Sequence, residues 1–108
     1  MVAIIELVAS EHDRPPEGTP IRVEVRDTSL ADARSVKVAG VDSVVRGRLG
    51  TWLDTVEIDV DPADSLTVWA LADVDGDGEV GVGDYITQAS YPVPQAQEAR
   101  ITVALRRV

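Results

Sequence analysis

The most informative residues of this chain are the regularly spaced acids between residues 73 and 84, a segment that reads Asp-Val-Asp-Gly-Asp-Gly-Glu-Val-Gly-Val-Gly-Asp. Positions 1, 3 and 5 of this segment hold Asp73, Asp75 and Asp77, position 6 holds Gly78 and position 12 holds Asp84. Calcium takes six to eight oxygen ligands, and alternate residues of a tight loop can turn their carboxylates toward one centre. A glycine at position 6 permits the sharp turn that this arrangement requires. The spacing therefore predicts one Ca²⁺ site in this loop.

The remaining loop positions complete the expected coordination. Glu79, at position 7, would contribute its backbone carbonyl, and Gly81, at position 9, has no side chain, so a water would fill that vertex. Val80, at position 8, is expected to anchor the loop to the core. Asp84 is one methylene shorter than the Glu usual at position 12. We therefore expect a modest affinity, on the order of 10⁻⁵ to 10⁻³ M, with Mg²⁺ as the alternative cation.

The loop resembles the calcium loops of EF-hands and dockerins, but its flanks do not read as two helices. Residues 66–72 are rich in strand formers, and residues 85–91 suit a strand or a short helix. The sequence thus predicts an EF-hand-like loop on a different scaffold. The alternative is an acidic, glycine-rich turn that binds nothing specific. A calcium sensor is not expected, because strands cannot open as a helix pair does.

Composition limits the classes of function. The chain has 108 residues and a net charge of −9, and five of its nineteen acids lie in the 73–84 loop, so the rest carries only −4. An acidic chain with no basic cluster argues against nucleic-acid or anionic-membrane partners. The absence of cysteine excludes disulfides, thiolate metal sites and cysteine nucleophiles. The apolar N-terminal segment, residues 1–9, is too short for a membrane span, is unlike a signal peptide and reads as a strand.

Alternating apolar and polar residues predict an all-β chain, with one β-sandwich domain over residues 1–108. About seven short, mostly antiparallel strands are expected, with the acidic loop between two late ones. The predicted strands are 2–9, 21–27, 34–41, 55–61, 66–72, 85–93 and 100–106; a turn is expected at 28–33, and 44–52 is ambiguous. The side chains predicted to face inward are Ile21, Val23, Val25, Val36, Val38, Val56, Ile58, Val60, Ile101, Val103 and Leu105. On the predicted strand 21–27, Arg22, Glu24 and Arg26 are expected to face water.

One segment suggests a family. Residues 21–33, Ile-Arg-Val-Glu-Val-Arg-Asp-Thr-Ser-Leu-Ala-Asp-Ala, resemble a segment of the YbaY/YscW-like bacterial lipoproteins, which include pilotin-like chaperones of type III secretion. The later order is also similar: an alternating strand, a Pro-Ala-Asp turn, a strand ending in Ala-Leu-Ala, an Asp/Gly loop and then Pro-Val at residues 92–93. The resemblance implies a β-sandwich, an exported or periplasmic location and, in the pilotin members, a partner peptide. This chain lacks the family's lipid-bearing cysteine, so lipid anchoring does not carry over.

Other residues that could do chemistry have simpler interpretations. His12 lies in a proline-rich loop between two acids and has no catalytic signature around it, so it reads as a solvated side chain. Trp52 is the better candidate for an exposed aromatic contact, whereas Trp69 reads as core or as a half-buried cover. A second acidic run is interpreted as the wet face of a strand, with a second, weaker cation site as the alternative, and it comprises Asp54, Glu57, Asp59, Asp61 and Asp64.

These observations support two functions from different classes. The first is a non-enzymatic β-sandwich module with one structural Ca²⁺ held by Asp73, Asp75, Asp77, Glu79 and Asp84. The alternative is a pilotin-like domain that binds a peptide or protein partner and carries the acidic loop incidentally. An enzyme that uses the loop metal as a Lewis acid ranks last, because the sequence offers no catalytic base beside the loop.

Overall fold

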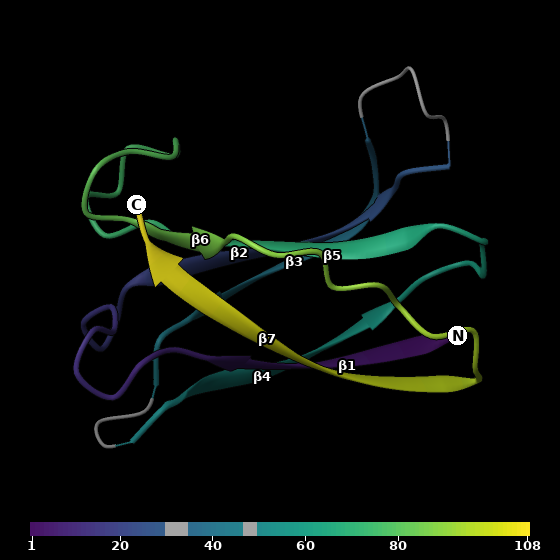
Figure 1. Ribbon diagram of the computed structural model, residues 1–108, viewed down its shortest axis with the longest axis horizontal. Coiled ribbons are helices and arrows are strands. Elements are labelled where there is room, and N and C mark those ends of the chain that lie inside the picture. Colours follow the sequence, from purple (N-terminus) through teal and green to yellow (C-terminus); the bar gives the residue numbers. More distant parts are fainter. Residues whose placement is uncertain (30–34, 47–49) are drawn as a thin grey trace.

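The computed structural model describes residues 1–29, 35–46 and 50–108, and within these it is an all-β fold (Figure 1). The prediction of an all-β chain is confirmed. No helix in the described residues is long and apolar enough to cross a membrane. The described strands are β1 (Val2–Val8), β2 (Pro20–Asp27), β3 (Val36–Val44), β4 (Trp52–Asp59), β5 (Leu66–Ala72), β6 (Tyr85–Thr87) and β7 (Glu98–Arg107).

The strands follow one another in the order β3-β2-β5-β6-β7-β1-β4, folded into two layers (Figure 1). β7 joins the layers, because its first residues pair in parallel with β1 and its last residues pair antiparallel with β6. The other strand pairs are antiparallel, as predicted. β3 and β4 are the terminal strands, and they approach each other closely enough to make the sheet a nearly closed sandwich.

The core forms where alternation is regular. Ile21, Val23 and Val25 of β2 are buried. The inward residues Val56 and Ile58 of β4 are buried as well, and so is Val60, which directly follows that strand. Fully burying one such side chain contributes about 1.5–3 kcal/mol to stability. In β7, Val103 and Leu105 are buried and Ile101 is half-buried. The core prediction is therefore confirmed for Val56, Ile58, Val60, Val103 and Leu105, and confirmed in part for Ile101.

The prediction for the third strand is wrong in its phase. Val36 and Val38 were expected to face inward, but they are 58% and 47% exposed. The ladder between β2 and β3 shifts at this point and leaves Val38 without a partner, which is a β-bulge. Beyond the bulge the alternation is reversed, so Ala39 and Val41 pack against the core instead. The predicted start at residue 34, most of the predicted 28–33 turn and part of the ambiguous 44–52 segment lie outside the described residues.

Glu24 was expected to face water, but it is only 6% exposed. It lies opposite Trp69 in the ladder between β2 and β5. Arg26 bonds its carboxylate at 2.8 Å and places its guanidinium 4.8 Å from the centre of the Trp69 ring. The long Arg26 side chain therefore covers both neighbours on the outer face of the sheet. Trp69 is half-buried, in agreement with its prediction as a cover, and Trp52 is 42% exposed, as expected.

Asp54 also departs from its prediction as a solvated acid, because it is only 7% exposed. It has the same parity as the inward residues Val56 and Ile58, so its carboxylate points toward the interior between β3 and β4. There the Ser43 hydroxyl donates to it, and Arg46 Nε lies 3.5 Å from its second oxygen. The other acids of that run, Glu57, Asp59, Asp61 and Asp64, are exposed, as predicted.

The strand predicted at 85–93 is much shorter in the structure, where β6 ends at Thr87. The chain then continues beside β5 by isolated bonds, from Val68 N to the Tyr91 carbonyl at 3.0 Å and from Val93 N to the Leu66 carbonyl at 2.9 Å. Pro92 lacks an N–H and so cannot extend a regular ladder.

Candidate metal centre

The acidic loop connects β5 to β6 at one end of the sandwich (Figure 1). Asp73 directly follows β5, and its N–H donates to the Pro20 carbonyl at 2.9 Å. Asp84 directly precedes β6, and its carbonyl accepts the Val108 N–H at 2.8 Å. Both ends of the loop are therefore fixed to neighbouring strands, which limits how far its acids can move apart.

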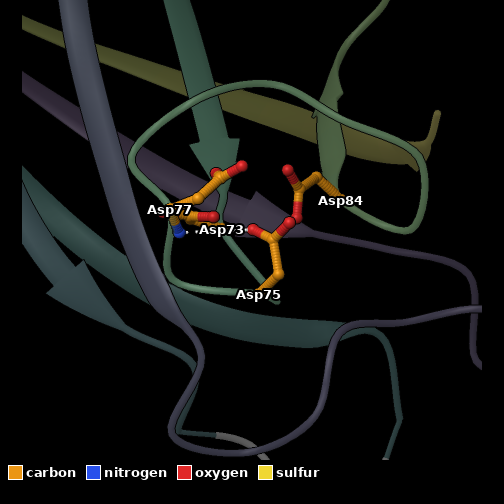
Figure 2. Close-up of side chains that lie close together, drawn as sticks. All are labelled: Asp73, Asp75, Asp77 and Asp84. Atoms are coloured by element: carbon orange, nitrogen blue, oxygen red, sulfur yellow. Dashed lines mark hydrogen bonds between the residues drawn. The ribbon is translucent and has the colours of Figure 1, made fainter.

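Four of the predicted ligands come together. One carboxylate oxygen from each of Asp73, Asp75, Asp77 and Asp84 lies within 4.8 Å of all the others. Figure 2 shows these side chains gathered on the inner side of the loop. Two oxygens on opposite sides of a Ca²⁺ ion, each about 2.4 Å from it, are about 4.8 Å apart. The carboxylate spacing therefore suits one calcium-sized cation, and all four donors are the hard oxygens that calcium prefers.

Hydrogen bonds between side chains and backbone give the loop its curvature. Asp73 accepts the Gly76 N–H at 3.1 Å and the Gly78 N–H at 2.7 Å. Asp75 accepts the Asp77 N–H at 3.3 Å in the same manner. Gly78 has a φ of 80°, in agreement with the turn predicted at position 6, and Gly76 has a φ of 73°. Both are left-handed conformations that strongly favour glycine, so the Asp-Gly-Asp-Gly order shapes the loop as well as supplying ligands.

Asp84 has a structural role that the sequence analysis did not anticipate. Its side chain is 1% exposed, and both of its oxygens accept backbone N–H groups. Val74 N donates to Oδ1 at 2.8 Å and Gly81 N donates to Oδ2 at 2.9 Å. The bond from Val74 ties the beginning of the loop to its end, and the bond from Gly81 holds the last turn of the loop. Each carboxylate oxygen has two lone pairs, so a cation can still share one of them.

The crowded carboxylates affect one another's protonation. The neighbouring Asp73 carboxylate, and with it Asp77, raises the pKa of Asp75 above its ordinary value. For Asp73 itself the largest influence is desolvation, which raises the pKa, but hydrogen bonds from Gly78, Asp75 and other loop groups outweigh it and the pKa is lowered. The opposite shifts arise because Asp75, once protonated, can donate a hydrogen bond to Asp73, which keeps its charge. A bound cation would take the place of that proton in balancing the carboxylate charges.

Two predictions about the rest of the loop have different outcomes. Val80 does not anchor the loop to the core, because it is 46% exposed and faces solvent, as does Val82 at 93% exposure. The loop is held instead by Asp84 and by the bonds at its two ends. Glu79 is exposed and lies outside the group of four carboxylates found among the described residues, and its role through a backbone carbonyl stays a prediction.

A second polar cluster lies beside the loop and was missed from the sequence. The Tyr85 hydroxyl donates to Asp13 Oδ1 at 2.7 Å, and Arg107 Nε donates to the same oxygen at 2.9 Å. The bonds from Arg107 and Tyr85 lower the pKa of Asp13, whereas burial, together with Asp13, raises the pKa of Tyr85. These partners are 72 and 94 residues from Asp13 in the chain, so no local pattern could have revealed them. His12, next to Asp13, is exposed as predicted.

Comparison with known proteins supports the fold more than the loop. No protein-family profile and no curated protein sequence matches the chain. Among solved structures, the chain is similar to an alternative pilotin from the type II secretion system of Vibrio cholerae, with a TM-score of 0.67 and 19% sequence identity. The similarity covers 100% of this chain and 98% of that one. A pilotin-like fold is therefore supported along the whole chain, in line with the family resemblance of residues 21–33.

Proposed function

We propose that this chain is a non-enzymatic protein-binding domain of the pilotin type. The observation that carries the proposal is the likeness of its fold, over 100% of the chain, to an alternative pilotin of type II secretion. A net charge of −9 further favours a partner with a basic binding segment.

A binding experiment tests this proposal. The immobilised domain would be exposed to envelope extracts of the source organism, and retained proteins would be identified and then purified for calorimetry. The pilotin proposal predicts that a component of a secretion system is retained and binds the purified domain with one-site stoichiometry. Retention of nothing beyond what binds an unrelated acidic domain of similar size would contradict it.

As a second function, we propose that the 73–84 loop binds one Ca²⁺ that stabilises the domain. The carboxylate group of Asp73, Asp75, Asp77 and Asp84 supports this, because its spread matches the diameter of a calcium coordination sphere. The ion would neutralise charges that now repel and would hold the loop between β5 and β6. At a hundredfold excess over Kd, binding stabilises the folded state by about 2.7 kcal/mol.

Calcium titration by calorimetry, together with thermal melts in EDTA, Ca²⁺ and Mg²⁺, tests the metal. We expect one-site binding and a higher melting temperature in Ca²⁺, both lost in Asp73→Ala and Asp77→Ala. Glu57→Ala is the matched control, because it removes one exposed acid that lies outside the loop. Absence of heat and identical melts up to millimolar Ca²⁺ would refute the metal and leave the protein-binding proposal unaffected.

A further inference from the structure

The two terminal strands of the sheet leave a seam between them, which we call the β3–β4 seam. In the described residues β3 has a backbone ladder only with β2, and β4 has one only with β1. Close to the ends of the two strands, the seam is closed by the Arg46 N–H bond to the Leu53 carbonyl at 2.9 Å and by the Ser43 hydroxyl on Asp54. The closure is therefore local, and further along the described parts of β3 and β4 no ladder joins the two strands.

Toward its other end the seam opens into a hollow of about 220 Å³. One wall is Val38, at the bulge of β3, and another is formed by residues at and beyond the end of β4. Met1 also lines the hollow, and its ammonium group donates to the Val60 carbonyl at 3.0 Å. Val36 and Val38, on the same strand, expose 58% and 47% of their surface. The acids Asp59 and Asp61 are exposed at the hollow. The open end thus combines apolar side chains, strand edges and two acids against one ammonium group.

We propose that an extended segment of a partner protein adds as a strand to the edge of β3 in this seam. Unpaired strand edges bind such segments through backbone hydrogen bonds, and side chains at alternate positions then give specificity. Here the apolar side chains of the segment would contact Val36 and Val38, and Lys or Arg residues would face Asp59 and Asp61. The inference rests on the proposed protein-binding function and states where and how the partner is bound.

A second copy of this chain fits the seam less well than a basic partner. Each copy carries a net charge of −9, and two copies meeting at an acidic edge would repel each other. Opposite charge in the partner removes this obstacle, which is why the proposal specifies a basic segment.

The probe is a short synthetic peptide of alternating Val and Lys, capped at both ends. Its control is a peptide of the same composition with Val and Lys in separate blocks, which has the same charge but cannot present alternate faces. We expect the alternating peptide to bind about tenfold more tightly and to slow hydrogen exchange at β3 amides, followed by NMR. Val38→Lys should weaken its binding about tenfold, and Val36→Lys provides an independent check of the same edge. Val108→Lys, which changes a similarly exposed valine (43%), should have no effect.

Each other outcome overturns the seam proposal. Equal binding of the two peptides would show attraction by charge alone, and protection of amides outside β3 and β4 would place binding elsewhere. A wild-type dimer that Val38→Lys dissociates in sedimentation would make the occupant a second copy. If a secretion partner captured by the whole domain binds Val38→Lys as well as wild type, the seam proposal fails and the protein-binding function stands.

Discussion

Replacing Asp84 should damage the fold even when no metal is present, whereas replacing Asp75 should not. Asp84 is 1% exposed and accepts the N–H groups of Val74 and Gly81 at 2.8 and 2.9 Å. Asp75 is exposed, and its nearest backbone donor is 3.3 Å away. Both are candidate ligands in one loop, so a comparison of the two separates a structural carboxylate from one whose role depends on a cation.

The expected magnitude follows from the two bonds. A hydrogen bond to a charged group contributes about 1.5–3 kcal/mol, and a buried donor left unpaired costs a similar amount. The loop can relax and admit water, so we expect Asp84→Ala to lose about 2–4 kcal/mol rather than the full sum. At about 4 °C per kcal/mol for a domain of this size, the melting temperature should fall by about 8–16 °C. Asp84→Asn keeps one acceptor and should lose about half as much.

Asp75→Ala should behave differently with and without calcium. Asp75→Ala removes a carboxylate whose charged form its neighbours Asp73 and Asp77 disfavour, so in EDTA the melting temperature should stay the same or rise slightly. In Ca²⁺ the same variant should lack part or all of the stabilisation that wild type gains, because one ligand is missing.

Thermal melts followed by circular dichroism, in EDTA and in millimolar Ca²⁺, measure both effects. The reasoning about Asp84 would be refuted if Asp84→Ala and Asp75→Ala melted at the same temperature in EDTA. The reasoning about Asp75 would be refuted if its variant were strongly destabilised in EDTA, since its carboxylate would then stabilise the fold without a cation.

Two further predictions concern side chains outside the loop. The pKa of Tyr85 is raised above 10.0 and that of Asp13 is lowered below 3.8, so the hydrogen bond between them should stabilise the domain between these two pH values. This stabilisation should be lost as pH rises through the folded pKa of Tyr85 or falls through the folded pKa of Asp13. Urea denaturation measured against pH should show both limits, and Tyr85→Phe should remove the alkaline limit. Asp54→Ala should lower the free energy of unfolding in urea by about 2–3 kcal/mol, because the Ser43 hydroxyl and Arg46 lose their shared partner. A loss no greater than that of Glu57→Ala would contradict the inward placement of Asp54.

The features that sequence predicted correctly are those decided by local geometry. A twelve-residue loop that ligates one ion sets its ligand spacing within itself, so Asp73, Asp75, Asp77 and Asp84 could be grouped from their spacing alone. The same holds for the apolar residues Ile21, Val23 and Val25 of β2 and Val56 and Ile58 of β4, whose alternate spacing places them in the core.

The errors occur where a partner strand decides the outcome. Val38 is exposed because the ladder with β2 shifts beside it, and the bulge reverses the alternation between Val38 and Val41. Asp13 meets Tyr85 and Arg107 only because β6 and β7 are brought beside the loop after β1. Asp54 is different, because it lies two residues before Val56 and therefore on the same, inward face of β4. Its charge led to the wrong interpretation that it is solvated.

The positions of the loop and the seam indicate that metal and peptide should act independently. Asp73 lines a surface hollow together with Asp42 and Ser43, so the loop lies beside the closed end of the β3–β4 seam. Val38, at the open end, is five residues from Ser43 along β3, or about 17 Å away. The carboxylates that calcium would neutralise are therefore more than a Debye length from the proposed peptide contacts at physiological salt. Peptide affinity measured in EDTA and in Ca²⁺ should agree within about twofold, and a larger difference would require coupling of the two sites through β3 itself.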